Sequence, residues 1–382
     1  MKITRSFDGG SIEVINNTNA NNISLELTND NSSSDSQWFY FDCEVEVNKA
    51  YTMNITNAGE STFAKAWQGY QAFATYDKKH WFRVNTHYTD GTLMISHTPE
   101  HTKVSYAYFV PYGYEQHQTL INVAVSSPLG SLTSLGLTPD GNSIDLLTIQ
   151  TPGDDNKEKI WLIARQHPGE TMSSWFIEGF INRLLSEDKL SKEILERSIF
   201  HIVVNMNIDG SIRGNHRTNA KGLDLNRQWH TPSKIDVPEV YFVQHAMNKK
   251  GVDLFIDVHG DEEIPYNFMM GSSTSCRLKK QAEAFKYNFA ESTTDFQTEV
   301  DYDTFNNGQS SCASTACCGS SNINKDQSKA RDYVERQFNC LSLLLEMPFL
   351  DNENSEKGVS TQRCSELGAI MLEPIYKHLT SS

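Results

Sequence analysis

The sequence predicts a small antiparallel β-sandwich followed by an α/β domain with a mixed, mainly parallel sheet flanked by helices. Residues 38–112 contain short alternating runs separated by turn residues, with no long amphipathic helix between them. From residue 159 onward, apolar runs alternate with stretches of helical spacing, which is typical of parallel sheets covered by helices. A length of 382 residues agrees with two to three domains of ~150 residues. We therefore expect domains at residues 1–112 and 113–382.

The first domain is predicted from strands that are rich in aromatic and β-branched residues. Asp90-Gly91 lies between two alternating runs and predicts a tight hairpin. The Asn/Ser-rich stretch from Asn16 to Ser36 is expected to form surface loops. The predicted strands are QWFYFDCEVEV, YTMNITN, HWFRVNTHY, GTLMISHT and KVSYAYFVPY.

The second domain is predicted from four buried strands and four helices. In such sheets, ligands bind beyond the carboxyl ends of the strands. The strands are expected at residues 159–165, 200–207, 252–260 and 341–347. The helices are expected at residues 171–186, 238–250, 278–290 and 365–379, the last with an irregularity at Pro374.

Charge and hydropathy argue against nucleic acid and membranes as partners. Lys plus Arg is 33 and Asp plus Glu is 48, so the net charge is −15, which disfavours nucleic acid and anionic membranes. No apolar run approaches the ~20 residues that cross a bilayer. The start of the chain lacks the apolar region of a secretory signal, so we expect a cytoplasmic protein.

The seven cysteines do not form a regular disulfide framework. Their number is odd and their spacing irregular. Cys312, Cys317 and Cys318 could form part of a metal knuckle, but no second pair stands at zinc-finger spacing. Reduced thiols in a Ser/Gly-rich loop are the favoured interpretation, and a reducing cytoplasm fits them.

Three potential metal ligands follow the predicted strands. His167 and Glu170 stand three apart in a Pro-Gly turn after the first strand, and His259 ends the third strand. Two imidazoles and one carboxylate with an open fourth position are the ligand set of a catalytic zinc site. His-x-x-Glu alone is common by chance, but its combination with a second strand-end histidine favours a metal site.

A carboxylate and a group of arginines accompany this set. Glu346 ends the apolar run LLLEM, and a carboxylate there is either a solvent-reaching strand end or a general base. Arg213, Arg217 and the pair Asn226-Arg227 lie between the second and third strands. They could bind a substrate carboxylate or stabilise an oxyanion, or they could belong to a solvated loop.

Taken in order, HPGE, N-x-DG, DLNR, the strand-end histidine and LLLEM resemble the zinc metallocarboxypeptidases. The stretch FVPYGYEQH and the preceding β-sandwich resemble the cytosolic carboxypeptidase branch. The resemblance implies one Zn²⁺ per chain held by His167, Glu170 and His259, with Glu346 as the base that activates a water.

The resemblance also assigns roles to the residues around the metal. It implies that Asn226 and Arg227 hold the terminal carboxylate of a peptide or protein tail. Arg217 matches the arginine that polarises the scissile carbonyl, with Arg213 as a rival. Asp224 would orient a metal-binding imidazole.

Two further positions bear on substrate recognition. The family usually has a mobile tyrosine before the catalytic glutamate. Here residues 304–332 contain no tyrosine and Tyr333 lies in a predicted helix, so the sequence does not place this role, and Tyr302 is one candidate. Arg331 lies where this branch often carries a basic residue. It would select an acidic C-terminal residue if it faces the specificity pocket, and otherwise it is an exposed arginine at a helix start.

The leading hypothesis is a zinc exopeptidase that hydrolyses the C-terminal peptide bond. An N-acyl-amino-acid deacylase is the alternative, although the branch with that activity lacks an N-terminal sandwich. A non-catalytic peptide-binding module would need a missing ligand or base, and none is missing. The oligomeric state does not follow from the sequence.

Overall fold

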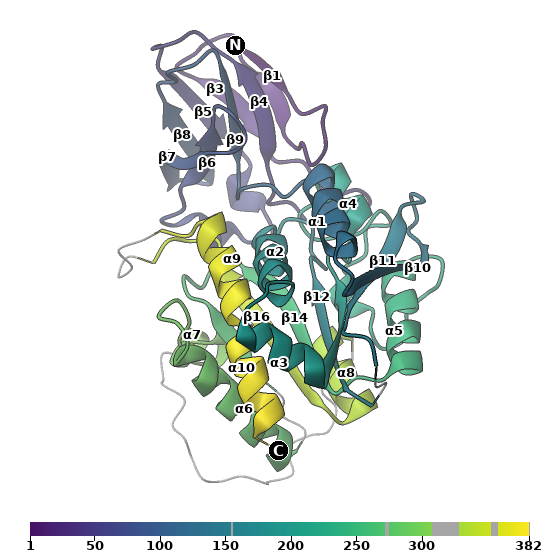
Figure 1. Cartoon of the computed structure of the whole chain (residues 1–382). Coiled ribbons are helices and arrows are strands. Elements are labelled where there is room, and N and C mark those ends of the chain that lie inside the picture. The colour runs from purple at the N-terminus through teal and green to yellow at the C-terminus, as the bar shows by residue number, and fades with distance from the viewer. Residues whose placement is uncertain (154–155, 272–274, 308–327, 353–357, 382) are drawn as a thin grey trace.

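The computed structural model describes residues 1–382 except 154–155, 272–274, 308–327, 353–357 and 382. Two parts follow one another along the chain (Figure 1): a strand-rich N-terminal part and a larger part in which helices surround a central sheet. Among the described residues, no helix combines the length and apolar character that crossing a bilayer requires.

The N-terminal sheet has nine strands in the order β1-β4-β9-β6-β7-β8-β5-β3-β2. It folds over at β7, where Trp81–Val84 pairs with β6 and Asn85–Thr89 pairs with β8. Both halves bury their apolar side chains in one core. The bounds are β1 Lys2–Thr4, β2 Glu13–Asn16, β3 Ile23–Glu26, β4 Tyr40–Glu44, β5 Tyr51–Ile55, β6 Ala72–Thr75, β7 Trp81–Thr89, β8 Thr92–His97 and β9 Lys103–Ala107.

Two expectations for this part are wrong. The sheet is not wholly antiparallel, because β3 and β5 pair in parallel. The stretch from Asn16 to Ser36 is not only surface loop, because it contains β3, whose Ile23 and Leu25 are fully buried. The Asn/Ser-rich flanks of this short strand hide its alternation. The hairpin at Asp90-Gly91 is confirmed, and both residues have the positive φ of a two-residue hairpin turn.

The central sheet of the larger part has the order β10-β11-β13-β12-β14-β16-β15. Its four middle strands, β13, β12, β14 and β16, run parallel, and the outer strands pair antiparallel. The sheet is therefore mixed with a parallel centre. The bounds are β10 Gly130–Leu137, β11 Ser143–Ile149, β12 Glu158–Ala164, β13 Ser198–Val203, β14 Leu254–Asp261, β15 Phe268–Met270 and β16 Leu341–Pro348.

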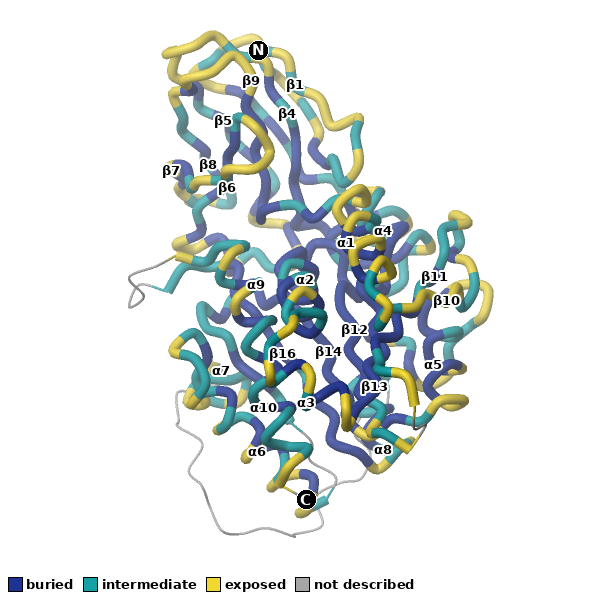
Figure 2. The backbone as a smooth tube through the Cα atoms, in the orientation of Figure 1, coloured by how far each residue is buried: buried dark blue, intermediate teal, exposed yellow. Residues whose placement is uncertain are grey.

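Helices cover both faces of this sheet, so its middle strands are buried over most of their length (Figure 2). Along β12, Ile160 and Leu162 face the core shared with α2, α3, α6, α9 and α10, whereas Trp161 and Ile163 face the core shared with α5 and α8. The bounds are α1 Tyr114–Ser126, α2 Met172–Leu184, α3 Lys189–Arg197, α4 Ile208–Arg213, α5 Pro238–Lys250, α6 Cys276–Ala290, α7 Tyr302–Asn307, α8 Ala330–Phe338, α9 Thr361–Ile370 and α10 Leu372–Thr380.

The C-terminal helix differs from the prediction. Residues 365–379 belong to two helices, α9 and α10, which meet at Met371. Pro374 is the third residue of α10, a position whose amide has no partner within the helix. The proline therefore lies in the first turn of α10, and the irregularity expected near it is a break between two helices.

The cysteines agree only in part with the expectation of reduced thiols. Cys43, Cys340 and Cys364 are free and buried, but Cys276 is disulfide-bonded. Cys312, Cys317 and Cys318 lie outside the described residues.

The two parts share one continuous apolar core. Tyr108, just after β9, stacks on Phe349 at the end of β16 with ring centroids 4.6 Å apart. Phe349 lies three residues after Glu346. The N-terminal part is thus packed directly against the edge where the predicted site residues lie.

Candidate active site

The turn after β12 carries the first two candidate ligands. Arg165 adopts a left-handed conformation with φ of 63°, and its buried Nε donates to the carbonyl of Pro168 at 2.7 Å. This bond closes the turn that leads from the strand to α2. A Cβ on Gly169 would lie 2.4 Å from Nδ1 of His216, so only glycine fits there. The turn then presents His167 and Glu170 on the same side.

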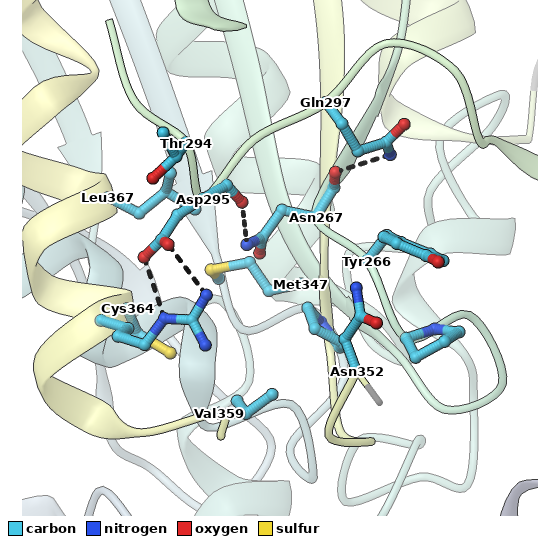
Figure 3. A pocket seen from close by; sticks show the side chains of 13 residues that line it. Tyr266, Asn267, Thr294, Asp295, Gln297, Met347, Asn352, Val359, Cys364 and Leu367 are labelled. Atoms are coloured by element: carbon cyan, nitrogen blue, oxygen red, sulfur yellow. Dashed lines mark hydrogen bonds and ion pairs between the residues drawn. The ribbon is translucent and has the colours of Figure 1, made fainter. Parts of the chain in front are cut away.

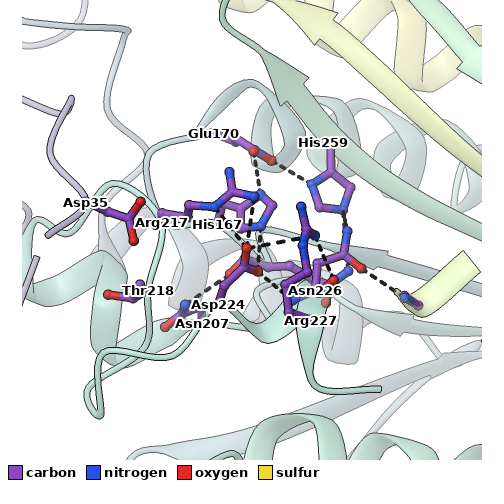
Figure 4. A network of polar contacts seen from close by, with 12 residues as sticks. Asp35, His167, Glu170, Asn207, Arg217, Thr218, Asp224, Asn226, Arg227 and His259 are labelled. Atoms are coloured by element: carbon purple, nitrogen blue, oxygen red, sulfur yellow. Dashed lines mark hydrogen bonds and ion pairs between the residues drawn. The ribbon is translucent and has the colours of Figure 1, made fainter. Parts of the chain in front are cut away.

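His167, Glu170 and His259 converge at the carboxyl edge of the parallel strands (Figure 4). Nδ1 of His167 lies 2.6 Å from Oε1 of Glu170, and Nδ1 of His259 lies 2.9 Å from Oε2 of the same carboxylate. One potential ligand atom from each residue falls within a set whose members are all within 4.8 Å of one another. All three side chains are buried.

A second carboxylate fixes each imidazole from its other side. Nε2 of His167 lies 3.0 Å from Oδ1 of Asp224, as the sequence led us to expect, and Nε2 of His259 lies 3.0 Å from Oδ2 of Asp257. Both rings are thereby oriented with Nδ1 toward Glu170.

Asp257 is a functional candidate that the sequence reasoning missed. Its position two residues before His259 on β14 places both side chains on the same face of the strand, which is the signal that could have found it. Gln166 donates to Asp257 at 2.8 Å and accepts from the indole of Trp229 at 2.8 Å. A chain of polar groups thus supports the second imidazole.

Buried charges of opposite sign dominate the electrostatics of this cluster. Burial by itself would lower the pKa of His259, but Asp257 and Glu170 outweigh it and raise that pKa well above its usual value. Burial would likewise raise the pKa of Glu170, yet the two imidazoles lower it. The arrangement favours positive charge among the three groups, a role that a bound cation fills.

The donor set fits zinc. Two oriented imidazole nitrogens and a carboxylate oxygen, buried and converging, are the protein ligands of catalytic zinc sites, which leave one position for water or substrate. His167, Glu170 and His259 would hold the ion, and Asp224 and Asp257 would support the two imidazoles.

Glu346 lies directly beside this set. In the β14–β16 register it is the partner of His259, so the two side chains project from neighbouring strands on the same face. Its Oε1 accepts from the hydroxyl of Tyr302 at 2.9 Å, while its buried Oε2 has no hydrogen-bond partner among the described residues. Burial raises the pKa of Glu346 well above its usual value, with Glu170 and Asp261 adding to the effect. Tyr302, a candidate for the family's mobile tyrosine, thus donates a hydrogen bond to the candidate base.

The structure separates the two rival arginines. The guanidinium of Arg217 contacts Asp224 through Nε at 2.9 Å. The same carboxylate contacts His167, so Asp224 links the guanidinium to this imidazole. Arg213 forms a bidentate pair with Asp140 at 2.7 and 2.8 Å on the surface. Only Arg217 is connected to the metal-binding cluster by these contacts.

Asn226 and Arg227 lie beside His259 and Asp224 of the cluster (Figure 4). The Asn226 side chain accepts from the amide of Ala330 at 2.9 Å, and its Nδ2 lies 3.4 Å from Nε2 of His259. Arg227 is 42% exposed and donates to its neighbour's carbonyl at 2.9 Å. A half-exposed guanidinium next to the cluster can bind an incoming carboxylate.

Arg331 is the second residue of α8. Its guanidinium pairs with Asp332 through contacts of 3.0 and 2.8 Å, and its side chain is 14% exposed. It is therefore not an exposed helix-start arginine. The amide of the preceding residue, Ala330, contacts Asn226, which keeps this helix start beside the site.

A cavity of about 440 Å³ lies beyond the end of β16 (Figure 3). Met347 and Pro348, which directly follow Glu346, line it together with Asn267. An ion pair between Asp295 and Arg363, at 2.8 Å, closes one side. None of the candidate metal ligands lines this cavity.

A buried His-Glu-His set at the carboxyl edge of a helix-covered parallel sheet, with a carboxylate beside it, defines a metallohydrolase. Residues 3–109 match the family model of the cytosolic carboxypeptidase N-terminal domain, and residues 117–358 match that of zinc carboxypeptidase. The chain belongs to the zinc carboxypeptidase family and is a metallocarboxypeptidase.

Two solved relatives share the whole architecture, and a longer human protein matches over part of its length. A metallo-carboxypeptidase from Burkholderia cenocepacia is 39% identical with a TM-score of 0.93, and 100% of each chain is covered. The metallo-carboxypeptidase of Pseudomonas aeruginosa, solved with (2-guanidinoethylmercapto)succinic acid, is 35% identical with a TM-score of 0.90, covering 99% of this chain and 100% of that one. Cytosolic carboxypeptidase 1 of Homo sapiens is 29% identical over 72% of this chain, which corresponds to only 26% of that protein.

Proposed function

We propose that this chain removes the C-terminal residue from peptides or protein tails, using one Zn²⁺ held by His167, Glu170 and His259. The observation that carries the proposal is the buried oxygen of Glu346 beside this ligand set, for which the described part of the chain offers no hydrogen-bond partner. When bound, the zinc ion would act as a Lewis acid and lower the pKa of a water molecule at the site.

Glu346 performs the proton transfers in this proposal. Its Oε2 accepts a proton from the attacking water and later delivers it to the leaving amine. A raised pKa suits this task, because the carboxyl must hold the proton between the two transfers. Tyr302 fixes the other oxygen, so that Oε2 is the one that faces the reaction.

The arginines bind the two ends of the reacting group. Arg227, with Asn226 beside it, holds the free carboxylate of the substrate, because its half-exposed guanidinium is the accessible one. Arg217, fixed by Asp224, polarises the scissile carbonyl and stabilises the oxyanion that follows attack. Arg213 has no part in the reaction.

A preference for acidic C-terminal residues enters the proposal through Arg331. Its guanidinium would exchange Asp332 for a substrate carboxylate. The Pseudomonas aeruginosa neighbour was solved with (2-guanidinoethylmercapto)succinic acid, a ligand that contains both carboxylic acid groups and a guanidino group. Comparing C-terminal Glu, Lys and Ala substrates in the wild type and in Arg331→Ala tests this point directly.

We also propose that the protein acts in the cytoplasm and that the domains divide at residues 112 and 113. Several relatives are named cytosolic carboxypeptidases, and the net charge of −15 disfavours nucleic acid and anionic membranes as partners. A peptide or protein tail remains the proposed partner.

The test is a peptide library assayed with added zinc and after chelation, with the released residue identified. Peptides with a free C-terminus should lose one residue at a time in the presence of zinc, and amidated peptides should remain intact. Cleavage of amidated peptides would contradict the role of Arg227. Hydrolysis of small N-acyl amino acids without peptide cleavage would replace the proposal by the deacylase alternative, which the match to the N-terminal domain disfavours.

A further inference from the structure

The loop at residues 30–32 of the N-terminal part reaches the loop that carries Arg217. Asp30 is 4% exposed, and its carboxylate accepts four hydrogen bonds, all from residues more than 180 positions later. Oδ1 accepts from the amide of His216 at 2.6 Å. Oδ2 accepts from the amides of Arg217 and Thr218 at 2.8 Å each, and from the Thr218 hydroxyl at 3.0 Å.

Three successive amides that point at one carboxylate fix the backbone of the segment between them. Arg217 is the middle residue of the three, so Asp30 sets the direction in which its side chain leaves the chain. Asp224 holds the other end of that side chain at 2.9 Å. The guanidinium of Arg217 also lies over the ring of Phe63, 5.7 Å from its centroid, and Phe63 too belongs to the N-terminal part.

The neighbouring contacts show that the two loops fit closely. Asn31 donates to the carbonyl of Ala220 at 2.7 Å and accepts from Asn215 at 2.7 Å. Gly222 has a φ of 75°, and a Cβ there would lie 2.5 Å from the carbonyl oxygen of Ser32. Asn31 therefore holds the flanks of the Arg217 loop, whereas Asp30 holds its centre.

We propose that Asp30 is a positioning residue for catalysis, which acts across the boundary between the two parts by orienting Arg217 through the backbone of residues 216–218. This inference rests on the proposed role of Arg217 at the scissile carbonyl. Through the buried Asp30, the N-terminal part would contribute to the reaction by positioning a residue of the larger part.

The test compares Asp30→Asn with Asn31→Ala in the full-length, zinc-loaded protein. An amide side chain supplies one oxygen where the carboxylate supplies two, so Asp30→Asn leaves at least one of the backbone amides without its acceptor. We expect kcat to fall about 10- to 100-fold with KM nearly unchanged, the size of effect seen when a supporting residue is removed. Asn31→Ala should leave kcat within about twofold of wild type, because it leaves all four hydrogen bonds to the Asp30 carboxylate in place.

A double-mutant cycle with Arg217→Lys separates positioning from general loosening. If Asp30 acts through Arg217, Asp30→Asn should have little further effect on kcat once Arg217 is replaced. Multiplicative effects, or an unchanged kcat in Asp30→Asn, would overturn the proposal. If Asp30→Asn does not fold, Thr218→Val removes only the hydroxyl donor and should lower kcat about threefold; an unchanged kcat in this variant would overturn the proposal as well.

Amide hydrogen exchange provides a readout that does not depend on turnover. Exchange at residues 216–218 should accelerate in Asp30→Asn and remain slow in Asn31→Ala. Unchanged exchange in Asp30→Asn would overturn the positioning role. A wild-type protein that protects these amides but cleaves no peptide would instead contradict the proposed function.

Discussion

Two pairs of buried histidines lie in contrasting surroundings in this protein, and the contrast bears on what marks the candidate site. Buried His216 belongs to neither pair, because its Nε2 lies 2.8 Å from a single carboxylate, that of Glu262. At the candidate metal site, His167 and His259 each lie between two carboxylates, and their pKa values are raised. In the body of the same domain, His117 and His201 are also buried, but burial lowers their pKa values to about 4 and about 3.

The pKa of a buried imidazole is thus shifted in opposite directions in the two regions. An imidazole without a carboxylate stays neutral in a low-dielectric core and fills space. An imidazole between two carboxylates sits where a positive charge is stabilised, and a metal ion supplies that charge when it binds. Burial alone therefore does not mark a functional histidine; the paired carboxylates do.

The largest effect is expected at the buried carboxylate of this edge. Glu346→Gln keeps the shape and the contact with Tyr302 but cannot accept a proton, so kcat should fall 10²- to 10⁴-fold. Zinc content, measured by atomic absorption, should match that of the wild type because Glu346 is not one of the proposed ligands. A variant that keeps wild-type kcat would exclude Glu346 as the base.

The sequence predicted most of this edge because the necessary signals are local. His167 and Glu170 stand in one turn, and the rule that parallel strands end at one edge of a sheet brought His259 and Glu346 to them. Asp30 could not be predicted, since its partners are 186 to 188 residues away and its Asn/Ser-rich surroundings indicate an exposed loop. The short strand β3 was missed for the same compositional reason.

A second prediction concerns the two arginines that the sequence left as rivals. Arg217→Ala should lower kcat 10²- to 10³-fold, the usual cost of removing an oxyanion donor. Arg213→Ala should change kcat less than twofold and stability by less than ~1 kcal/mol, because it removes only a surface pair with Asp140. Steady-state kinetics and urea unfolding check both. A larger loss of kcat in Arg213→Ala than in Arg217→Ala would mean that Arg213 polarises the scissile carbonyl.

A third prediction tests the carboxylates that distinguish the two kinds of histidine. Asp257→Asn should weaken zinc binding 10- to 100-fold, because an amide supports His259 less well than a carboxylate does. Competition with a chromophoric chelator measures the change. Asp253→Asn is the matched control, since Asp253 precedes the same strand and accepts from the amide of Lys159 at the opposite end. Equal affinities in the wild type and both variants would show that Asp257 does not support the metal.

The smallest effect is expected from His117, a buried histidine of α1. Neither ring nitrogen has a hydrogen-bond partner among the described residues, and burial lowers its pKa from 6.5 to about 4. Below pH 6.5 the unfolded chain therefore binds a proton that the folded chain does not bind until about pH 4, so stability is lost as the pH falls through this window. Between pH 7 and 5.5 the loss should be about 1 kcal/mol, and His117→Leu should remove it.

Urea unfolding at both pH values measures the change, with His245→Leu on the exposed side of α5 as the control. An equal pH dependence in the wild type and His117→Leu would mean that His117 is protonated in the fold, and the contrast with the site histidines would then fail.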